Sequence, residues 1–108
     1  ILMKNITHIE FKNQIESDPN AIIIDCRTAM EWDQGIIENS ILLDLFDSHG
    51  FMHESEKFDK DKSYYVYCRS GVRSVNACQI LESIGIKSTY NLLGGIMSWQ
   101  DKIVAPKN

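Results

Sequence analysis

Short apolar runs alternate with amphipathic stretches along the chain. Ala21–Asp25 is a continuous apolar run of strand length, and the turn signal Asp18-Pro-Asn precedes it. Because the run is apolar on both faces, it is typical of a buried strand in a parallel sheet. The same pattern predicts three further strands, at Ser40–Asp44, Ser63–Tyr67 and Thr89–Leu93.

Helical patterns fill the intervals between these strands. Thr28 and Glu31 have the spacing of a capping box, which predicts the start of a helix. Gly85 provides a stop for another. In all, helices are expected over residues 9–17, 28–35, 74–84 and 96–103. The alternation of strands and helices indicates one α/β domain spanning residues 1–108, with its functional site at the carboxyl ends of the strands.

Composition and charge narrow the class of partner. The net charge of the 108 residues is −4, which argues against nucleic acid or an anionic membrane as a partner. No apolar run reaches the roughly 18 residues of a membrane span, and no signal peptide is visible. Met3 is the expected natural start, although a removed leader stays open.

The three cysteines have no framework spacing, which favours free thiols in a reducing compartment. The expected location is therefore the cytoplasm, with the periplasm left open because the natural amino terminus is uncertain. Cys68 stands apart from the other two because it follows a predicted strand directly and precedes a predicted helix.

The turn that begins at Cys68 has the composition of a reactive site. A thiolate is the nucleophilic form of cysteine, and a helix N-terminus or nearby cations lower the pKa of a thiol. Both devices are expected here, since the helix starts near the end of the turn and two arginines flank a Ser-Gly pair. The residues expected to bind an anion around Cys68 are Arg69, Ser70, Gly71, Val72 and Arg73.

The segment Cys68–Arg73 resembles the active-site loop of single-domain rhodaneses, which are sulfurtransferases. Asp25-Cys-Arg, Glu31-Trp and residues 35–40 resemble the first signature of that family, and residues 91–99 resemble its C-terminal signature. The sequence departs from the first signature at Ile36, where the family often has His, and at residues 39–40, where it often has Gly-Ala. The departures affect local packing more than chemistry.

The resemblance implies a fold and a mechanism. The fold would be a mostly parallel five-stranded sheet of order 1-5-4-2-3 with helices on both faces. Cys68 would take the outer sulfur of thiosulfate or a related persulfide donor and carry it as a persulfide, with Arg69 and Arg73 holding the departing sulfite. A thiol or cyanide, or a sulfur-accepting protein, would then remove the sulfur. The family's mechanism requires no metal and no organic cofactor.

Two other functions remain as alternatives. Dual-specificity-type phosphatases and arsenate reductases place five residues between cysteine and arginine, whereas four separate Cys68 from Arg73. The shorter loop suits a single sulfur atom better than a phosphoryl group. A non-catalytic rhodanese-like module that binds or senses partners is the second alternative, and the presence of the cysteine counts against it.

Other residues with chemical potential have simpler interpretations. Asp25, Arg27 and Glu31 are expected to form an ion-paired brace beside the loop. Cys26 is expected to pack in the core, as is Cys78, although the family's sheet order would place Cys26 close enough to Cys68 to act as a resolving thiol. A metal pair at His49 and His53 is disfavoured, and these residues are expected in a solvated polar connection.

Overall fold

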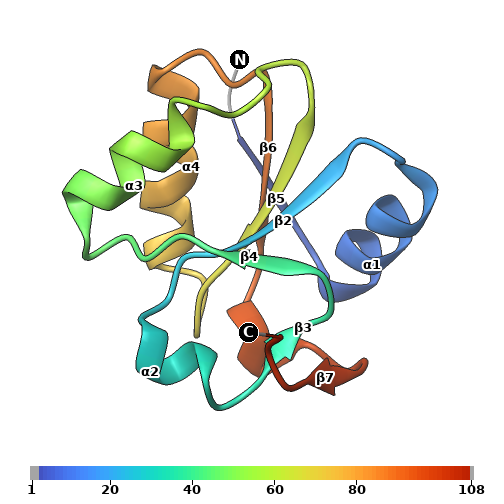
Figure 1. Cartoon of the computed structure of the whole chain (residues 1–108). Helices are drawn as coiled ribbons and strands as arrows, with labels where there is room; N and C mark the ends of the chain where they lie inside the picture. The colour runs from blue at the N-terminus through green and yellow to red at the C-terminus, as the bar shows by residue number, and fades with distance from the viewer. Residues whose placement is uncertain (1–2, 108) are drawn as a thin grey trace.

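The centre of the molecule is a sheet of five parallel strands (Figure 1). The computed structural model describes residues 3–107, so Ile1, Leu2 and Asn108 lie outside the described residues. The strands are β1 (Lys4–Ile6), β2 (Ala21–Asp25), β4 (Ser40–Leu42), β5 (Ser63–Tyr67) and β6 (Ser88–Leu92). Their spatial order is β1-β6-β5-β2-β4, and counting only these five strands along the chain gives the expected order 1-5-4-2-3.

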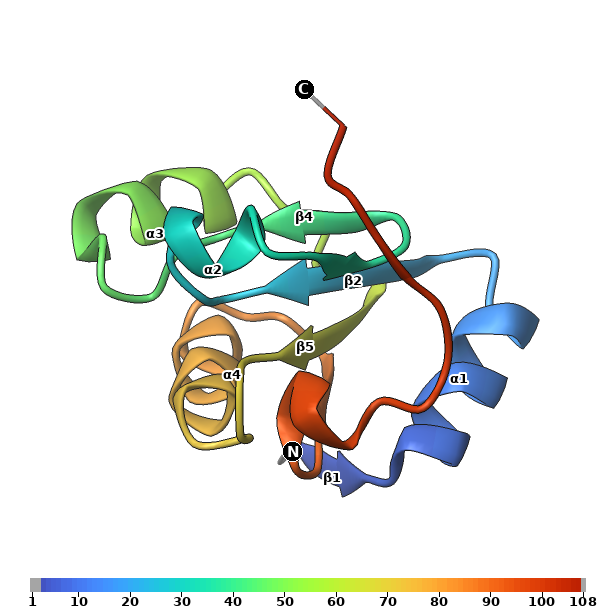
Figure 2. The same ribbon diagram turned by 90° about the horizontal axis from the view of Figure 1, so that it is seen from below.

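Helices cover both faces of this sheet, as Figure 2 shows. Helix α1 (His8–Ser17) lies on one side, and α3 (Ser48–Ser55) and α4 (Arg73–Ser83) lie on the other. The short α2 (Ala29–Trp32) follows β2 and begins at the predicted capping box. In that box the Thr28 hydroxyl accepts from the Glu31 N–H while the Glu31 carboxylate accepts from the Thr28 N–H.

The central strands are apolar on both faces because each face supports its own core. Ile24 of β2 and Val66 of β5 pack with Leu81 of α4. Their neighbours along the strands belong to a second cluster on the α1 side, which contains Ile23 and Phe11. This alternation places Cys26 and Cys68, each two residues further along, in the first cluster.

The structure corrects the interpretation of the segment around His49. It forms α3 rather than a polar connection, and the Asp47 side chain caps it by accepting from the Gly50 N–H. Phe51 and Ser55, one helical turn apart, are its buried residues. His49 and His53 are part of this helix, and no group of three potential metal-ligating residues occurs within residues 3–107.

The predicted final helix over residues 96–103 is also wrong. The chain makes one short 3-10 turn, η1 (Gly95–Ser98), and then a two-residue strand, β7 (Ile103–Val104). That strand pairs antiparallel with β3 (Ile36–Ile37) in a second small sheet. Among the helices of residues 3–107, none is long and apolar enough to cross a membrane.

Candidate active site

The Cys68 loop joins the carboxyl end of β5 to the start of α4, at the lower side of the molecule in Figure 1. Gly71 adopts a φ of +99°, a conformation that other residues resist. Its N–H donates to the Cys68 sulfur over 3.1 Å, so the loop backbone supplies a hydrogen-bond donor to this sulfur. A Cβ at this position would also lie 3.2 Å from the Gly94 nitrogen, so glycine allows the loop to pack closely on the C-terminal segment.

The C-terminal segment holds the loop in place through backbone hydrogen bonds. The Ile96 N–H donates to the Cys68 carbonyl over 2.9 Å, and the Met97 N–H donates to the Arg69 carbonyl over 3.2 Å. Gly95 has a φ of +62°, and a Cβ there would overlap both carbonyls. The glycine pair of the C-terminal signature therefore permits a direct backbone contact with the reactive loop.

The Cys68 side chain is almost completely buried, with 1% of the residue exposed. The Ser74 hydroxyl, in the first turn of α4, lies 3.3 Å from the sulfur and also bonds to the Asn91 amide oxygen. Asn91, on β6, is in turn fixed because its amide group donates to the Asn5 side chain over 2.9 Å. The single Ser74 proton can therefore be directed either to Asn91 or to a Cys68 thiolate.

Hydrogen bonds lower the pKa of Cys68 well below its ordinary value. The largest contribution comes from the Cys26 thiol, and the Ser74 side chain and N–H and the Gly71 N–H add to it, whereas burial opposes the shift. The same bond, together with burial, raises the pKa of Cys26. Of this pair, Cys68 is therefore the cysteine with the lowered pKa, and the causes are neutral donors, whereas the sequence analysis invoked the two arginines as well.

The two arginines of the loop have different environments. Arg73 forms a two-pronged ion pair with Glu31, with N–O distances of 2.8 and 2.9 Å, and its guanidinium lies 5.4 Å from the centre of the Phe46 ring. This pair lowers the pKa of Glu31 to about 2. Arg69 is exposed to solvent on the loop. Arg73 therefore joins the loop to α2, and the Arg69 side chain extends toward solvent.

The expected acidic and basic brace is split between two pairs. Arg27 binds both carboxylate oxygens of Asp25, with its closest contact at 2.8 Å, and also donates to the Gly35 carbonyl. Glu31 pairs with Arg73 of the loop instead of completing this group. The Asp25–Arg27 pair is buried and fixes the turn after β2, whereas the Glu31–Arg73 pair connects that turn to the loop.

The sequence interpretation assigned no role to Ser74 or Asn91, which contact the Cys68 environment. A signal for Asn91 was present, since an amide side chain in the middle of a buried strand needs hydrogen-bond partners. Ser70 and Val72 of the loop are exposed, as is Arg69. Cys26 and Cys78 are fully buried, as expected for packing, and all three cysteines are unpaired thiols.

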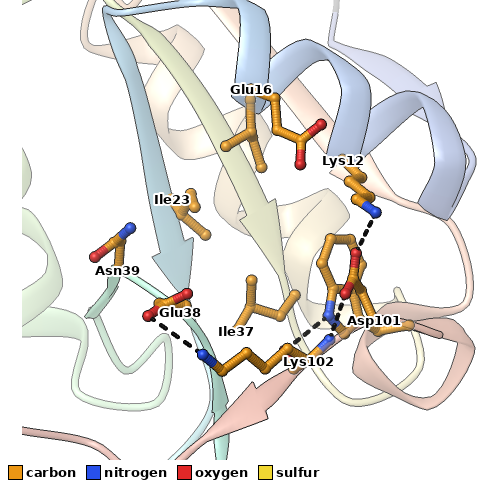
Figure 3. Close-up of a pocket in the computed structure, with 10 residues that line it drawn as sticks. Lys12, Glu16, Ile23, Ile37, Glu38, Asn39, Asp101 and Lys102 are labelled. Atoms are coloured by element: carbon orange, nitrogen blue, oxygen red, sulfur yellow. Dashed lines mark hydrogen bonds and ion pairs between the residues drawn. The ribbon is translucent and has the colours of Figure 1, made fainter.

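A pocket of about 240 Å³ lies elsewhere, on the face of the sheet that carries α1 (Figure 3). Its walls come from α1, β2, the β3–β4 connection and residues 99–102. The ion pairs Lys12–Asp101 and Lys102–Glu38 lie along it. The cavity and the Cys68 loop are therefore separate features of the molecule.

Comparison with known proteins gives a consistent result. The family model described as rhodanese-like domain matches residues 7–102. A Bacillus subtilis (strain 168) protein, YtwF, is 37% identical over 98% of both chains. An Allochromatium vinosum protein named sulfurtransferase is 30% identical over 98% of this chain and 99% of its own length. The crystal structure of a Staphylococcus aureus rhodanese-like domain protein is 32% identical, with a TM-score of 0.82 over 97% of this chain and 100% of that one. The chain therefore belongs to the rhodanese-like domain family.

Proposed function

We propose that this protein is a sulfurtransferase that carries sulfane sulfur as a persulfide on Cys68. The observation that carries the proposal is a buried Cys68 sulfur that accepts from the Gly71 N–H over 3.1 Å and lies 3.3 Å from the Ser74 hydroxyl. The name sulfurtransferase of the Allochromatium vinosum relative supports the reaction class. A Coxiella burnetii relative named thiosulfate sulfurtransferase GlpE, 30% identical over 93% of this chain and 90% of its own length, supports thiosulfate as a donor.

The reaction has two displacement steps at sulfur. In the first step the Cys68 thiolate attacks the outer sulfur of thiosulfate, the S–S bond breaks, and sulfite leaves with the bonding electron pair. In the second step an acceptor thiolate, or cyanide, attacks the transferred sulfur, and Cys68 leaves as a thiolate. Donors that stabilise the Cys68 thiolate make it a better leaving group in the second step, and the Gly71 N–H is one such donor to the Cys68 sulfur.

The arginines take separate roles in this proposal. Both terminal nitrogens of Arg73 are engaged by Glu31, so Arg73 holds the loop in shape. Arg69 is exposed beside Cys68 and is the residue that we assign to the departing sulfite. The acceptor is a low-molecular-weight or protein thiol, and the three unpaired thiols fit a reducing compartment such as the cytoplasm.

Kinetics and mass spectrometry test this function together. Thiosulfate alone should release one equivalent of sulfite and add the mass of one sulfur atom to the Cys68 peptide, and adding cyanide should give continuous turnover. Cys68→Ser should abolish both, whereas Cys78→Ala, which changes another cysteine of the same core cluster, should form the adduct as the wild type does. Hydrolysis of aryl phosphates at a comparable rate would contradict the assignment, as would an adduct that persists in Cys68→Ser.

The same assay separates the arginines. Arg69→Ala should lower kcat/KM with thiosulfate by about tenfold more than with an uncharged sulfane-sulfur donor, because only thiosulfate leaves as an oxyanion; a charge-assisted hydrogen bond contributes about 1.5–3 kcal/mol. Arg73→Ala should lower both by the same factor, because its contacts are made within the protein. The opposite pattern would assign the leaving group to Arg73.

A further inference from the structure

Two of the three cysteines occupy matching positions on neighbouring parallel strands. Strands β2 and β5 are paired with Asp25 opposite Tyr67, and the Cys26 N–H extends the ladder by donating to the Tyr67 carbonyl over 3.0 Å. Cys26 directly follows β2, and Cys68 directly follows β5. Adjacent strands lie about 4.8 Å apart, and the Cα atoms of a disulfide are usually about 4.4–6.8 Å apart. The backbone spacing is therefore one that a disulfide accepts.

The side chains of this pair point in the same direction. Residues alternate between the two faces of a strand, and both cysteines belong to the cluster that contains Ile24 and Val66, on the α4 side. Cys26 is 0% exposed and Cys68 is 1% exposed. Both side chains are therefore enclosed in the same core cluster, on the same face of neighbouring strands. Solvent does not separate them.

We propose that Cys26 is a resolving thiol, which gives the protein a second activity: the reductive discharge of its own persulfide as hydrosulfide. This inference rests on the proposed persulfide at Cys68. The Cys26 sulfur attacks the inner sulfur, which is the Cys68 Sγ, and a Cys26–Cys68 bond forms as the bond to the outer sulfur breaks. The outer sulfur leaves with the electron pair and takes up the Cys26 proton, so that one hydrogen sulfide is produced for each disulfide.

The electron balance of this step is closed within the protein. The outer sulfur is reduced to sulfide, and the two cysteines are oxidised to the disulfide. The product no longer has a free Cys68 and so cannot accept sulfur again until an external dithiol reduces it. With an acceptor present, transfer and turnover compete with this discharge; without one, the disulfide stops the enzyme and releases its sulfur.

The charge of the resting site explains why Cys26 does not react earlier. With a thiolate on Cys68, hydrogen bonding to that sulfur, burial and the neighbouring negative charge raise the pKa of Cys26, which keeps it a thiol. After sulfur transfer, the negative charge of the persulfide is on the outer sulfur, one bond further from Cys26. The restraint on Cys26 is thereby reduced only in the loaded protein.

The test uses the full chain, reduced, freed of small thiols and kept under anaerobic conditions with a chelator. One equivalent of thiosulfate is added without acceptor, and sulfite, sulfide and the intact mass are followed. The wild type should first gain the mass of one sulfur atom, then release one equivalent of sulfide and finish two hydrogen masses below the reduced protein. Non-reducing peptide mapping should find Cys26 joined to Cys68.

Cys26→Val is the informative variant because it keeps an apolar side chain of similar size in the core. It should form the same persulfide, more slowly because the largest contribution to the lowered pKa of Cys68 is lost, and then retain it and release no sulfide above background. Cys78→Ala is the matched control, since Cys78 is also fully buried in this cluster, and it should discharge like the wild type. Peptide mapping of the wild type gives the answer even when a variant folds poorly.

The result that would contradict the resolving role of Cys26 differs from the result that would contradict the proposed function. A wild type that releases sulfite and then retains the persulfide as long as Cys26→Val does would overturn the resolving role and leave the proposed function intact. A disulfide that joins Cys68 to Cys78 would overturn it as well. If neither sulfite nor a sulfur adduct appears in either protein, the proposed sulfurtransferase function fails, and this inference fails with it.

Discussion

The Cys68 loop and the pocket on the α1 face both contain charged side chains, but they differ in what those charges contact. In the pocket, Lys12 and Asp101 pair over 2.6 Å with 45% and 38% of their side chains exposed, and Lys102 pairs with Glu38 over 4.0 Å with still greater exposure (Figure 3). Around Cys68 the hydrogen-bond donors converge on one sulfur that has almost no contact with water.

This difference shows why cavity size is a poor guide to chemistry in this molecule. Exposed ion pairs are screened by water, so they contribute little to stability and do not create a reactive group. The Cys68 loop offers a nucleophile whose charge is held by fixed, buried donors, which is the arrangement that shifts a pKa. We therefore locate function by the buried donors around Cys68.

The largest effect is expected when one of the donors to the Cys68 sulfur is removed. In Ser74→Ala the pKa of Cys68 should rise by about one to two units, because a hydrogen bond to a charged group contributes about 1.5–3 kcal/mol and one unit corresponds to about 1.4 kcal/mol. The buried Asn91 amide oxygen also loses its Ser74 partner, so the protein should become less stable. The pH dependence of iodoacetamide alkylation, read at the Cys68 peptide, measures the pKa.

Ser83→Ala is the control for this variant. Ser83 lies on the same helix, but its hydroxyl is exposed and bonds only to the Ile80 carbonyl within its own helix. Its alkylation profile should match that of the wild type. An unchanged profile in Ser74→Ala would mean that the Cys68 thiolate is stabilised without the serine hydroxyl.

The second test concerns the partly buried ion pair between Glu31 and Arg73. Glu31→Gln keeps a side chain that can complete the capping box of α2 but removes the charge. The wild type should be more stable than the variant by about 2 kcal/mol near neutral pH, given two charge-assisted hydrogen bonds that are partly screened.

The pH dependence of that difference follows from the pKa of Glu31, which is lowered to about 2 in the folded protein. A carboxyl with a lowered pKa stabilises the fold fully above its unfolded value, and this contribution is lost as pH falls toward the folded value. Urea unfolding of both proteins should therefore show a constant difference above about pH 5 that shrinks steadily toward pH 2. A difference that persists at pH 2 would attribute the effect to packing.

Much of the fold could be predicted because its central strands are defined by local pattern. Ala21–Asp25 and Ser63–Tyr67 are apolar runs with both faces buried, and their predicted bounds match β2 and β5. The helix predicted for the final segment is wrong because the contacts of that segment are not local. Ile96 and Ile103 have helical spacing, yet Ile96 packs near α1 whereas Ile103 pairs with β3, about 66 residues earlier in the chain. Local periodicity carries no information about such a pairing.

The contacts of the candidate site likewise divide into those that local sequence predicts and those that it does not. Cys68, Gly71 and the start of α4 form one continuous segment, so the sequence predicts their proximity and the donor role of the loop. The pairing of Glu31 with Arg73 spans 42 positions and the bond from Ser74 to Asn91 spans 17, so neither follows from spacing. These contacts depend on the strand order, which brings the ends of β2, β5 and β6 together.

The third test concerns the charged side chains of the pocket, where we expect the smallest effect. Lys12→Ala removes the ion pair with Asp101 from the pocket wall, and Lys87→Ala removes a more exposed pair with Asp61 outside the pocket. Because water screens both pairs, each variant should shift Tm by less than about 2 °C. Turnover with thiosulfate and cyanide should equal that of the wild type in both. A loss of turnover in Lys12→Ala that Lys87→Ala does not share would link the pocket to the reaction at Cys68, and burial would then no longer be sufficient to locate the functional part of the molecule.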